Sequence, residues 1–376
     1  MSVIIKRVLD RKSLKTFISF PEKLYRNNPY YVPALFFDEM NTLDPLKNPG
    51  SAFCNSELYL AYRDEKIVGR VAAIVNHKAN KQWNHDEVRF GWFDFIDDPE
   101  VSGALIDKVI EFGHKFGMKQ IVGPLGFTDF DPEGMLIEGF DQEGTMPLIY
   151  NADYYPKHLE SMGFTKDADW LEYRISIPEV LPERFTRVAN IIKERNKLHI
   201  RSLTKKYVRE TKYGHKVFDL INETYKDLYN FTVLPTSMAD KYLGFYLSVL
   251  DLKFVSMVEN EKNELVAFGI TMPSLTKALQ KSRGRMFPFG WIPVLKSLYF
   301  KHEKGVELLL IGVRPDYRNA GLTSLLFADM FEKLSKAGFK WAETNAELET
   351  NNAIQNSWSG FDYVQNKRRR SYIKQI

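Results

Sequence analysis

The sequence predicts an α/β (α+β) protein made of two tandem copies of one unit. Hairpin patterns at 58–74 and 254–270 each place two apolar runs around a short charged turn. Gly69 and Gly269 are 200 positions apart, and the Gly-Phe pairs at 163 and 360 are 197 apart. A period that changes so little indicates a repeat, and the length of 376 residues suits two domains. The predicted copies are 1–177 and 198–376, with a helical linker at 178–197.

The elements of both copies follow one order. In the first copy we expect strands at 3–8 and 88–95 around the hairpin, then a helix that Asp98 and Pro99 begin, with Val101 to Phe116 supplying its apolar face. In the second copy the apolar run 308–311 predicts a strand, and the spacing of Leu322, Leu325, Leu326, Met330 and Leu334 predicts a helix that Gly338 ends. Strands at 198–203, 340–349 and around Tyr372 complete the second copy.

The turn 312–323 between that strand and helix is the most informative segment. A strand that breaks into a turn and opens a helix leaves backbone N–H groups at the positive helix end, which suits a pyrophosphate. Gly321 would let an anion approach the backbone, and Arg318 adds a positive charge. The alternative is an ordinary strand-to-helix turn. In the first copy Asp97, Asp98 and Glu100 occupy this place and would repel a phosphate, so we expect one anion site, in the second copy.

The pattern V-x-P-x-x-R-x-x-G, followed by a helix, a strand, an Asn-Ala stretch and Gly-Phe, resembles the GNAT acyltransferase superfamily. The resemblance implies two GNAT-like units, each a mixed, mostly antiparallel twisted sheet flanked by helices, with acyl-coenzyme A as co-substrate. It implies that Asn352 helps to hold the pantetheine arm. It also implies cofactor contacts from Val313, Arg318, Asn319, Ala320, Gly321, Leu322 and Thr323.

Two positions depart from the superfamily pattern. Thr323 stands where Gly or Ala is common, and Asn356 stands where a Tyr usually serves as general acid. Further segments resemble a narrower group of bacterial tandem-GNAT N-acyltransferases, some of which look like enzymes that N-acylate long-chain sphingoid bases. The matching segments are 24–33, 47–49, 68–72, 123–124, 138–141, 150–155 and 348–351.

Acyl transfer to an amine needs a base for the amine and a proton for the departing thiolate. Alternation along the strand predicted at 340–349 gives three candidate bases one parity: Glu347 first, then Glu349 and Glu343. The alternative is that each carboxylate is solvated or paired with an Arg. Spacing singles out no acid among the tyrosines Tyr150, Tyr154, Tyr155, Tyr363 and Tyr372.

Composition excludes several classes. The chain is 44% hydrophobic and 27% charged, and it has no apolar run of the roughly 20 residues that a spanning helix needs. Cys54 is the single cysteine, and the seven histidines show no ligand spacing, so we expect no metal site and a cytoplasmic protein. A net charge of +4 is too small to indicate nucleic acid as a partner.

The insert 275–304 has an uneven charge. It holds seven basic residues against one acidic residue, Glu303, and aromatic side chains interleave with them at 286–300. Such a segment suits peripheral contact with an anionic membrane or lipid. It suits equally a lid over an apolar acyl site, or a packing insert at a sheet edge or homodimer interface, and the sequence leaves monomer and homodimer open.

The predicted function is that of an acyl-CoA-dependent N-acyltransferase acting on an amine, with a long-chain or lipid amine favoured by the insert. Acyl-carrier protein is an alternative donor to coenzyme A. The alternative function is a catalytically silent tandem-GNAT scaffold or acyl-CoA sensor, which the missing Tyr at Asn356 favours.

Overall fold

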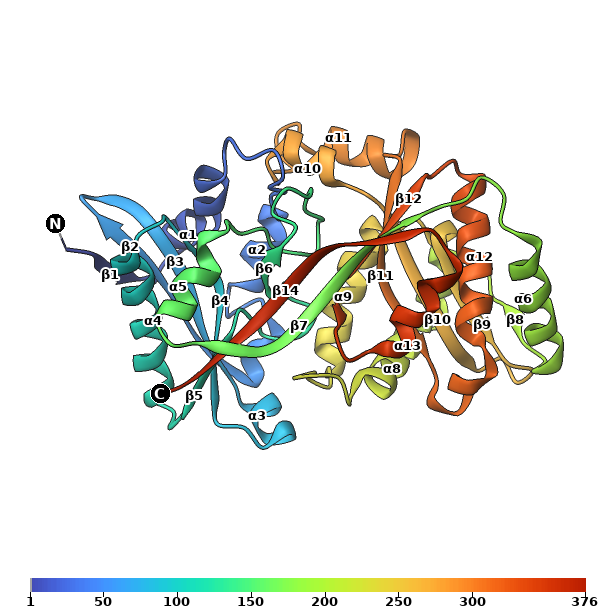
Figure 1. The fold of residues 1–376 in the computed structure, drawn as a ribbon, viewed down its shortest axis with the longest axis horizontal. Helices are drawn as coiled ribbons and strands as arrows, with labels where there is room; N and C mark the ends of the chain where they lie inside the picture. The colour runs from blue at the N-terminus through green and yellow to red at the C-terminus, as the bar shows by residue number, and fades with distance from the viewer. Residues whose placement is uncertain (1) are drawn as a thin grey trace. The chain divides into compact units, whose positions relative to one another are not determined.

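The computed structural model describes residues 2–376 and divides into two compact units (Figure 1). The first unit contains residues 2–171, Thr276–Pro293 and Asn366–Ile376. The second contains Glu172–Leu275 and Val294–Gln365. The units therefore do not follow the repeat in sequence throughout, because two segments from the second half of the chain pack in the first unit.

The sheet of the first unit is mixed and mostly antiparallel. Strands β1 to β4 pair antiparallel in order, β4 pairs parallel with β5, and β5 pairs antiparallel with the last part of β14. Its strands are β1 (Ile4–Arg7), β2 (Cys54–Arg63), β3 (Lys66–Asn76), β4 (Glu87–Phe95), β5 (Gln120–Gly123) and β6 (Met135–Glu138), with parts of β7 (Thr165–Ser176) and β14 (Tyr363–Gln375). Its helices are α1 (Arg11–Leu24), α2 (Phe36–Thr42), α3 (His77–Trp83), α4 (Pro99–His114), α5 (Tyr154–Ser161) and α10 (Thr276–Ser282), with a 3₁₀ turn at Pro49–Ala52.

The second unit repeats this plan. Strands β8 to β11 pair antiparallel, β11 pairs parallel with β12, and β12 pairs antiparallel with the end of β7. Its strands are β8 (His199–Ile200), β9 (Val255–Glu259), β10 (Leu265–Pro273), β11 (Gly305–Val313), β12 (Trp341–Thr344) and β13 (Glu347–Leu348). Its helices are α6 (Glu183–Arg195), α7 (Lys205–Glu210), α8 (Tyr213–Tyr225), α9 (Thr236–Val249), α12 (Leu322–Lys336) and α13 (Asn352–Gln355); α11 (Trp291–Leu295) spans the boundary. Short turns of 3₁₀ helix lie at Leu252–Phe254, Pro315–Ala320 and Asn356–Gly360, and Lys296–Phe300 is a π-helix.

The predicted fold class is confirmed, and the repeated glycines have one structural reason. A Cβ on Gly69 would lie 2.8 Å from Leu105 of α4, and a Cβ on Gly269 would lie 2.3 Å from the sulfur of Met330 in α12. In both units, therefore, the long helix lies so close to the strand that a side chain at this position would require the facing Leu or Met side chain to move. The expected helical linker at 178–197 contains α6, which packs beside α12.

The insert begins with α10, which is tied to the first unit. The Gln280 side chain donates to the carbonyl oxygens of Pro29 (2.9 Å) and Tyr31 (3.2 Å). The guanidinium of Arg285 lies 4.4 Å from the centre of the Phe36 ring. At least one basic side chain of the insert, that of Arg285, thus packs within the first unit.

Candidate functional site

The parallel strands β11 and β12 separate partway along β11. Their register runs from Gly305 opposite Trp341 to Leu308 opposite Thr344 and ends there. The backbone N–H of Asn345 then donates to the Leu308 carbonyl (3.0 Å). We call the backbone of 309–313, on the side away from β10, the open edge of β11.

Tyr225, at the end of α8, binds the open edge. Its hydroxyl donates to the carbonyl oxygen of Ile311 (2.7 Å) and accepts from the N–H of the same residue (3.3 Å). Because N–H directions alternate along a strand, the N–H of Val313 faces the same side as that of Ile311. Burial raises the pKa of Tyr225 to about 12, and the charge of Glu347 adds to the rise. Tyr225 therefore stays protonated and can donate a hydrogen bond at this edge.

The N-terminus of α12 follows the open edge directly. Gly321 is its cap, with φ of 80°, and no side chain accepts from the first N–H groups of the helix. Leu322 is buried, so only its backbone can meet a ligand; Ala320 and Thr323 are half-buried, and Asn319 is exposed. A helix of this length with an uncapped N-terminus attracts an anion.

Two arginines near this terminus have different roles. Arg314 is held by Asp316 (2.8 Å) and by Glu264 (3.4 Å), so its charge is balanced locally. Arg318 is exposed and donates one long hydrogen bond, of 3.4 Å, to the carbonyl of Thr224. Arg318 is thus the cation that an incoming phosphate would meet.

Two structural reasons, besides access for an anion, favour glycine at position 321. Its φ is in the left-handed region, and an added Cβ would lie 2.9 Å from the Ile192 side chain of α6. A bulky substitution at Gly321 would therefore strain the turn and push against α6. Arg318 is the better residue for testing the anion site.

The equivalent helix of the first unit, α4, has a filled N-terminus. The carboxylate of Asp98 accepts from the N–H of Glu100 (3.0 Å), and Arg63 pairs with both Asp98 and Glu100. A negatively charged cap satisfies the helix end and repels a phosphate. This geometry supports the expectation of a single anion site.

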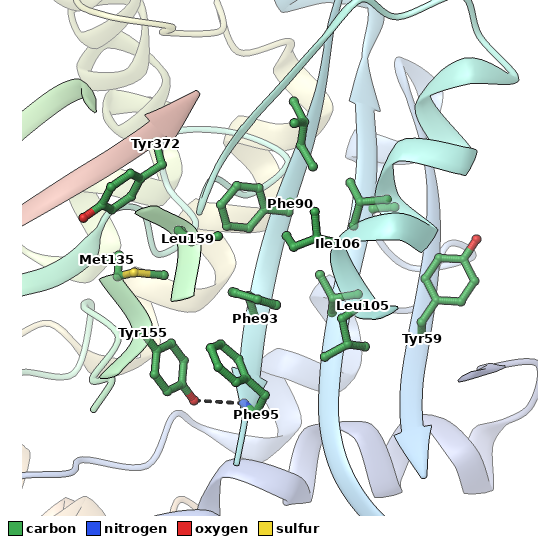
Figure 2. Packing of buried hydrophobic residues seen from close by; sticks show 14 of the residues in the cluster. Tyr59, Phe90, Phe93, Phe95, Leu105, Ile106, Met135, Tyr155, Leu159 and Tyr372 are labelled. Atoms are coloured by element: carbon green, nitrogen blue, oxygen red, sulfur yellow. Dashed lines mark hydrogen bonds between the residues drawn. The ribbon is translucent and has the colours of Figure 1, made fainter. Parts of the chain in front are cut away.

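The edge of β4 in the first unit is covered by aromatic side chains, as Figure 2 shows. The N–H of Phe95 donates to the Tyr155 hydroxyl (3.0 Å), and the Phe95 carbonyl accepts from Tyr154. The rings of Phe95 and Tyr155 lie 4.2 Å apart at their centres, and Phe93 packs 4.6 Å from Phe95. The place of the open edge is therefore occupied by core in this unit.

The continuous strand predicted at 340–349 is wrong. β12 ends at Thr344, because Asn345 turns to bond Leu308 with its backbone and Leu309 with its side chain (3.2 Å). β13 begins at Glu347 after this break. The parity argument for the carboxylates consequently does not extend beyond Thr344.

The three carboxylates lie in different surroundings. Glu343 is buried and pairs with Arg174 of β7 (2.7 Å), which also stacks on Trp341 (4.6 Å). Glu347 is half-buried and accepts from the indole N–H of Trp358 at 3.1 and 3.2 Å. Glu349 is half-buried, and its carbonyl accepts from Gln355 (3.2 Å).

Glu347 has the properties of a base near neutrality. Burial raises its pKa to about 8, and the hydrogen bond from Trp358 opposes that rise. Trp358 is itself buried and stacked on Phe327, with 4.6 Å between ring centres, so its N–H is fixed in place. Perturbed carboxylates of this kind are typical of functional sites.

The tyrosines considered from the sequence lie elsewhere. Tyr150, Tyr154, Tyr155 and Tyr372 bond to other groups of the first unit, and Tyr363 is exposed beside Tyr173. Tyr225 was missed, because nothing in the sequence links the end of α8 to Ile311. Asn352 is exposed at the start of α13, where it stays a predicted cofactor contact, and Asn356 is also exposed.

Residues 2–376 offer neither a candidate metal centre nor a candidate membrane span. Within that range no group of three or more His, Cys, Asp or Glu side chains is arranged to hold a metal ion. None of the helices described there combines the length and apolar character needed to cross a bilayer.

Two known proteins are similar in sequence to this chain over most of their length. The protein YghO of Escherichia coli K12 is 26% identical over 99% of this chain and 95% of its own length. A protein described as a bacterial ceramide synthase, from Caulobacter vibrioides, is 25% identical over 82% of this chain and 79% of its own length. No family model matches the chain.

Among solved structures, a tandem GNAT protein from the clavulanic acid biosynthesis pathway matches with a TM-score of 0.56 and 10% identity. The match covers 100% of this chain and 98% of the other. The resemblance to the GNAT superfamily is therefore confirmed at the level of a tandem fold.

Proposed function

We propose that this protein is an acyl-CoA-dependent N-acyltransferase whose site is in the second unit. The observation that carries the proposal is the open edge of β11 next to the uncapped N-terminus of α12. A strand edge that directs an N–H group away from the sheet, as at Val313, can bind an extended amide chain, and a helix N-terminus can hold a pyrophosphate. Arg318 adds charge for the phosphates, and Asn352 contacts the pantetheine arm.

The acyl group is transferred by direct attack. The neutral amine nitrogen attacks the thioester carbonyl carbon, whose oxygen the N–H of Val313 polarises. The carbon–sulfur bond then breaks, and the new C–N bond forms the amide. Glu347 accepts the proton that the amine loses.

The departing thiolate is stabilised by Tyr225, whose hydroxyl turns from the Ile311 carbonyl to the sulfur. A hydroxyl with a pKa of about 12 is a weaker acid than a thiol, whose ordinary pKa is about 8.5, so Tyr225 donates a hydrogen bond and keeps its proton. The pKa of Glu347, about 8, lies close to that of a thiol. Glu347 can therefore pass the amine proton on to the sulfur with little change in free energy.

The acceptor is a long-chain amine, and a sphingoid base is the specific candidate. The similarity to a bacterial ceramide synthase supports this choice, since a ceramide is an N-acylated sphingoid base. A GNAT fold alone supports only an amine acceptor. Acyl-carrier protein would be an alternative donor, because it presents the same pantetheine arm without the nucleotide.

Turnover tests the proposal. With an acyl-CoA and a long-chain amine, the purified protein should release free thiol, and titration calorimetry with coenzyme A should give one site per chain. Binding at one site without thiol release, for several acyl donors and amines, would instead support the sensor. Two equivalent sites would contradict the assignment to the second unit.

The exposed part of the insert contacts the membrane surface that supplies the acceptor. Phe287 and Phe289 are 85% and 72% exposed, and Lys281 and Arg283 of the same unit are exposed close to them in sequence. Exposed aromatic side chains enter the interface of a bilayer, and lysines meet anionic headgroups.

Vesicle sedimentation tests this contact. Changing Phe287 and Phe289 to Ser should reduce binding to phosphatidylglycerol vesicles. The wild type and every variant should bind neutral vesicles less than phosphatidylglycerol vesicles. Leu46→Ser is the matched control, because Leu46 is 95% exposed but lies outside the insert. Equal vesicle binding by the insert variant and the control would exclude a membrane role for these side chains.

A further inference from the structure

An open pocket of about 530 Å³ lies in the first unit, where no step of acyl transfer has been placed. Its wall comes from the end of α1 with the turn after it, and from the loop between β6 and α5. Three stretches singled out in the sequence, 24–33, 138–141 and 150–155, meet at this pocket. Its volume is within the range of roughly 300–1,000 Å³ that is usual for small-molecule sites.

Hydrogen bonds fix the aromatic side of the pocket. The side-chain amide of Asn28 donates to the Tyr150 hydroxyl (2.8 Å), which in turn donates to the Phe140 carbonyl (3.1 Å). The amide oxygen of Asn28 accepts from the N–H of Tyr30 (2.8 Å). The ring of Tyr150 also packs edge-on against that of Tyr25, with 5.5 Å between centres. These contacts tie the two wall segments together, so the aromatic residues that line the pocket are preorganised for a ligand.

The charged side chains of the pocket keep their charges available. Lys23 and Arg26 are exposed, and neither forms a hydrogen bond or ion pair with another of the described residues. Asp141 is exposed as well, and it accepts a hydrogen bond from the neighbouring Gln142 (3.2 Å). The described residues include no ion pair between Asp141 and either cation. The pocket therefore presents both signs of charge without neutralising them.

Other carboxylates close to the pocket are already paired. Glu22 lies 3.5 Å from Arg283 of the insert, and Asp153 lies 3.4 Å from Lys157. Among the described residues that line the pocket, the charges left for a ligand are consequently two cations and one carboxylate.

This set of groups is complementary to one class of ligand. A lysine and an arginine bind the oxygens of a phosphate. A carboxylate beside aromatic rings binds an ammonium group, because the ring faces also attract a cation. Asp141 would repel a ligand that is only anionic, and Lys23 and Arg26 would repel one that is only cationic. A ligand that carries both a phosphate and an ammonium group satisfies all three charges.

We infer that this pocket binds a phosphate ester that also carries an ammonium group, of which phosphoethanolamine is the simplest example. The inference goes beyond the proposed acyl transfer, because the residues of the pocket take no part in that reaction. The ester is either a soluble compound or the headgroup of a membrane lipid. The insert favours the lipid, since Gln280 bonds to the carbonyl of Pro29 at the pocket, and the exposed Phe287 and Phe289 follow in the same segment.

The binding of three small molecules to the purified protein tests the inference. Phosphoethanolamine should bind about tenfold more tightly than glycerol 3-phosphate, which lacks the ammonium group, and than ethanolamine, which lacks the phosphate. Ligand-observed NMR titrations measure the three dissociation constants. A preference below about threefold over either compound would overturn the inference.

Two substitutions should act differently on the two phosphates. Arg26→Ala should weaken phosphoethanolamine and glycerol 3-phosphate by at least about tenfold, the loss expected for a charged hydrogen bond. Asp141→Asn should weaken phosphoethanolamine but leave glycerol 3-phosphate unchanged or tighter, because it removes a charge that repels the phosphate. Arg11→Ala is the matched control, since Arg11 is exposed on α1 but does not line the pocket. An equal loss in the control, or no effect of either pocket substitution, would contradict the site.

Vesicle sedimentation separates the two sources of the ester. At equal phosphatidylglycerol content, vesicles completed with phosphatidylethanolamine or with phosphatidylcholine carry the same net charge. A lipid headgroup as the ligand predicts tighter binding to the phosphatidylethanolamine vesicles, because a primary ammonium donates hydrogen bonds to Asp141 and choline does not. Combining Arg26→Ala with Asp141→Asn should abolish this difference, although the net charge of the protein is unchanged.

The remaining outcomes are equally distinct. If the vesicles do not differ while phosphoethanolamine binds with the Arg26 and Asp141 dependence, the ligand is a soluble ester. None of these measurements depends on thiol release, so the pocket and the proposed acyl transfer can fail separately.

Discussion

Replacing Glu347 by Gln should lower kcat by roughly 10²–10⁴-fold, the range expected when a general base is lost. The amide oxygen can still accept from the indole N–H of Trp358, so the local packing is kept. Because Glu347 lies away from the N-terminus of α12 in sequence and bonds to Trp358, the affinity for coenzyme A should change little. Thiol release at saturating acyl-CoA and amine measures kcat, and calorimetry measures the affinity.

The pH dependence gives the magnitude that the structure predicts. With a pKa of about 8, Glu347 is ionised in about a tenth of the molecules at pH 7 and in about nine tenths at pH 9. The wild-type kcat should therefore rise about tenfold over that interval, and the variant should lose this rise. The ionisation of the amine itself affects both proteins equally, so the comparison isolates Glu347. Full activity in the variant, with the same pH profile, would refute the role of Glu347 and leave Glu349 as the next candidate.

Stability offers a second readout that does not depend on turnover. The pKa of Glu347 is raised on folding from about 4.5 to about 8, so the protonated carboxyl belongs to the folded state. The stabilisation that the protonated carboxyl gives the folded state is fully present below pH 4.5 and is lost as the pH rises through 8. The loss is at most ~5 kcal/mol, because each pH unit between the two pKa values changes the free energy of unfolding by ~1.4 kcal/mol. The wild-type melting temperature should consequently fall more than that of Glu347→Gln between pH 5 and pH 8.5. Parallel curves would show that the carboxyl is not perturbed.

Three further substitutions separate binding, chemistry and structure. Arg318→Ala should weaken coenzyme A binding by ~1.5–3 kcal/mol in calorimetry, while Arg63→Ala, which removes the partner of the capped helix α4, should leave it unchanged. Tyr225→Phe should lower kcat by roughly 10²-fold, with a smaller change in coenzyme A affinity, since it removes a hydrogen bond made to the leaving sulfur. Glu343→Gln should destabilise the protein by ~3–5 kcal/mol in thermal unfolding, because it leaves Arg174 without its ion pair, and should keep most of the kcat of the folded enzyme. If Glu343→Gln instead retains its stability and loses turnover, Glu343 is the base.

The parts of the fold that sequence predicts best are those that local chemistry determines. The apolar run before Gly312, the turn with Gly321 and the helical spacing after it correspond to β11 and α12. The repeat was visible because Gly69 and Gly269 meet one packing demand in each unit. Local signals of this kind need no knowledge of distant partners.

The carboxylates show where sequence stops being informative. Alternation predicted one face for Glu343 and Glu347, yet Glu343 is taken by Arg174, which is 169 positions away. The break after Thr344 depends on hydrogen bonds from Asn345 to β11, which no pattern within 340–349 reveals. The role of Tyr225 depends likewise on Ile311, 86 positions later in the chain.

The insert shows a different limit. Its composition indicated lipid contact, a lid or packing, and the structure supplies a contact for one part of it. Residues 276–293 pack in the first unit, where Gln280 bonds to the backbone of Pro29 and Tyr31. Phe287 and Phe289 of the same segment are exposed, so their rings are available to contact another surface.

The two copies illustrate how one fold keeps its architecture and loses a binding site. Both keep the glycine under the long helix, where an added Cβ would press on a side chain of that helix. They differ at the helix N-terminus, which Asp98 caps in the first unit and Gly321 leaves uncapped in the second. They also differ in the side chains at the strand edge, where Tyr154 and Tyr155 bond to the backbone of Phe95 and Tyr225 bonds to that of Ile311. A helix end that a carboxylate caps offers an acyl-CoA fewer donors, so the chemistry follows the unit in which the helix N-terminus remains uncapped.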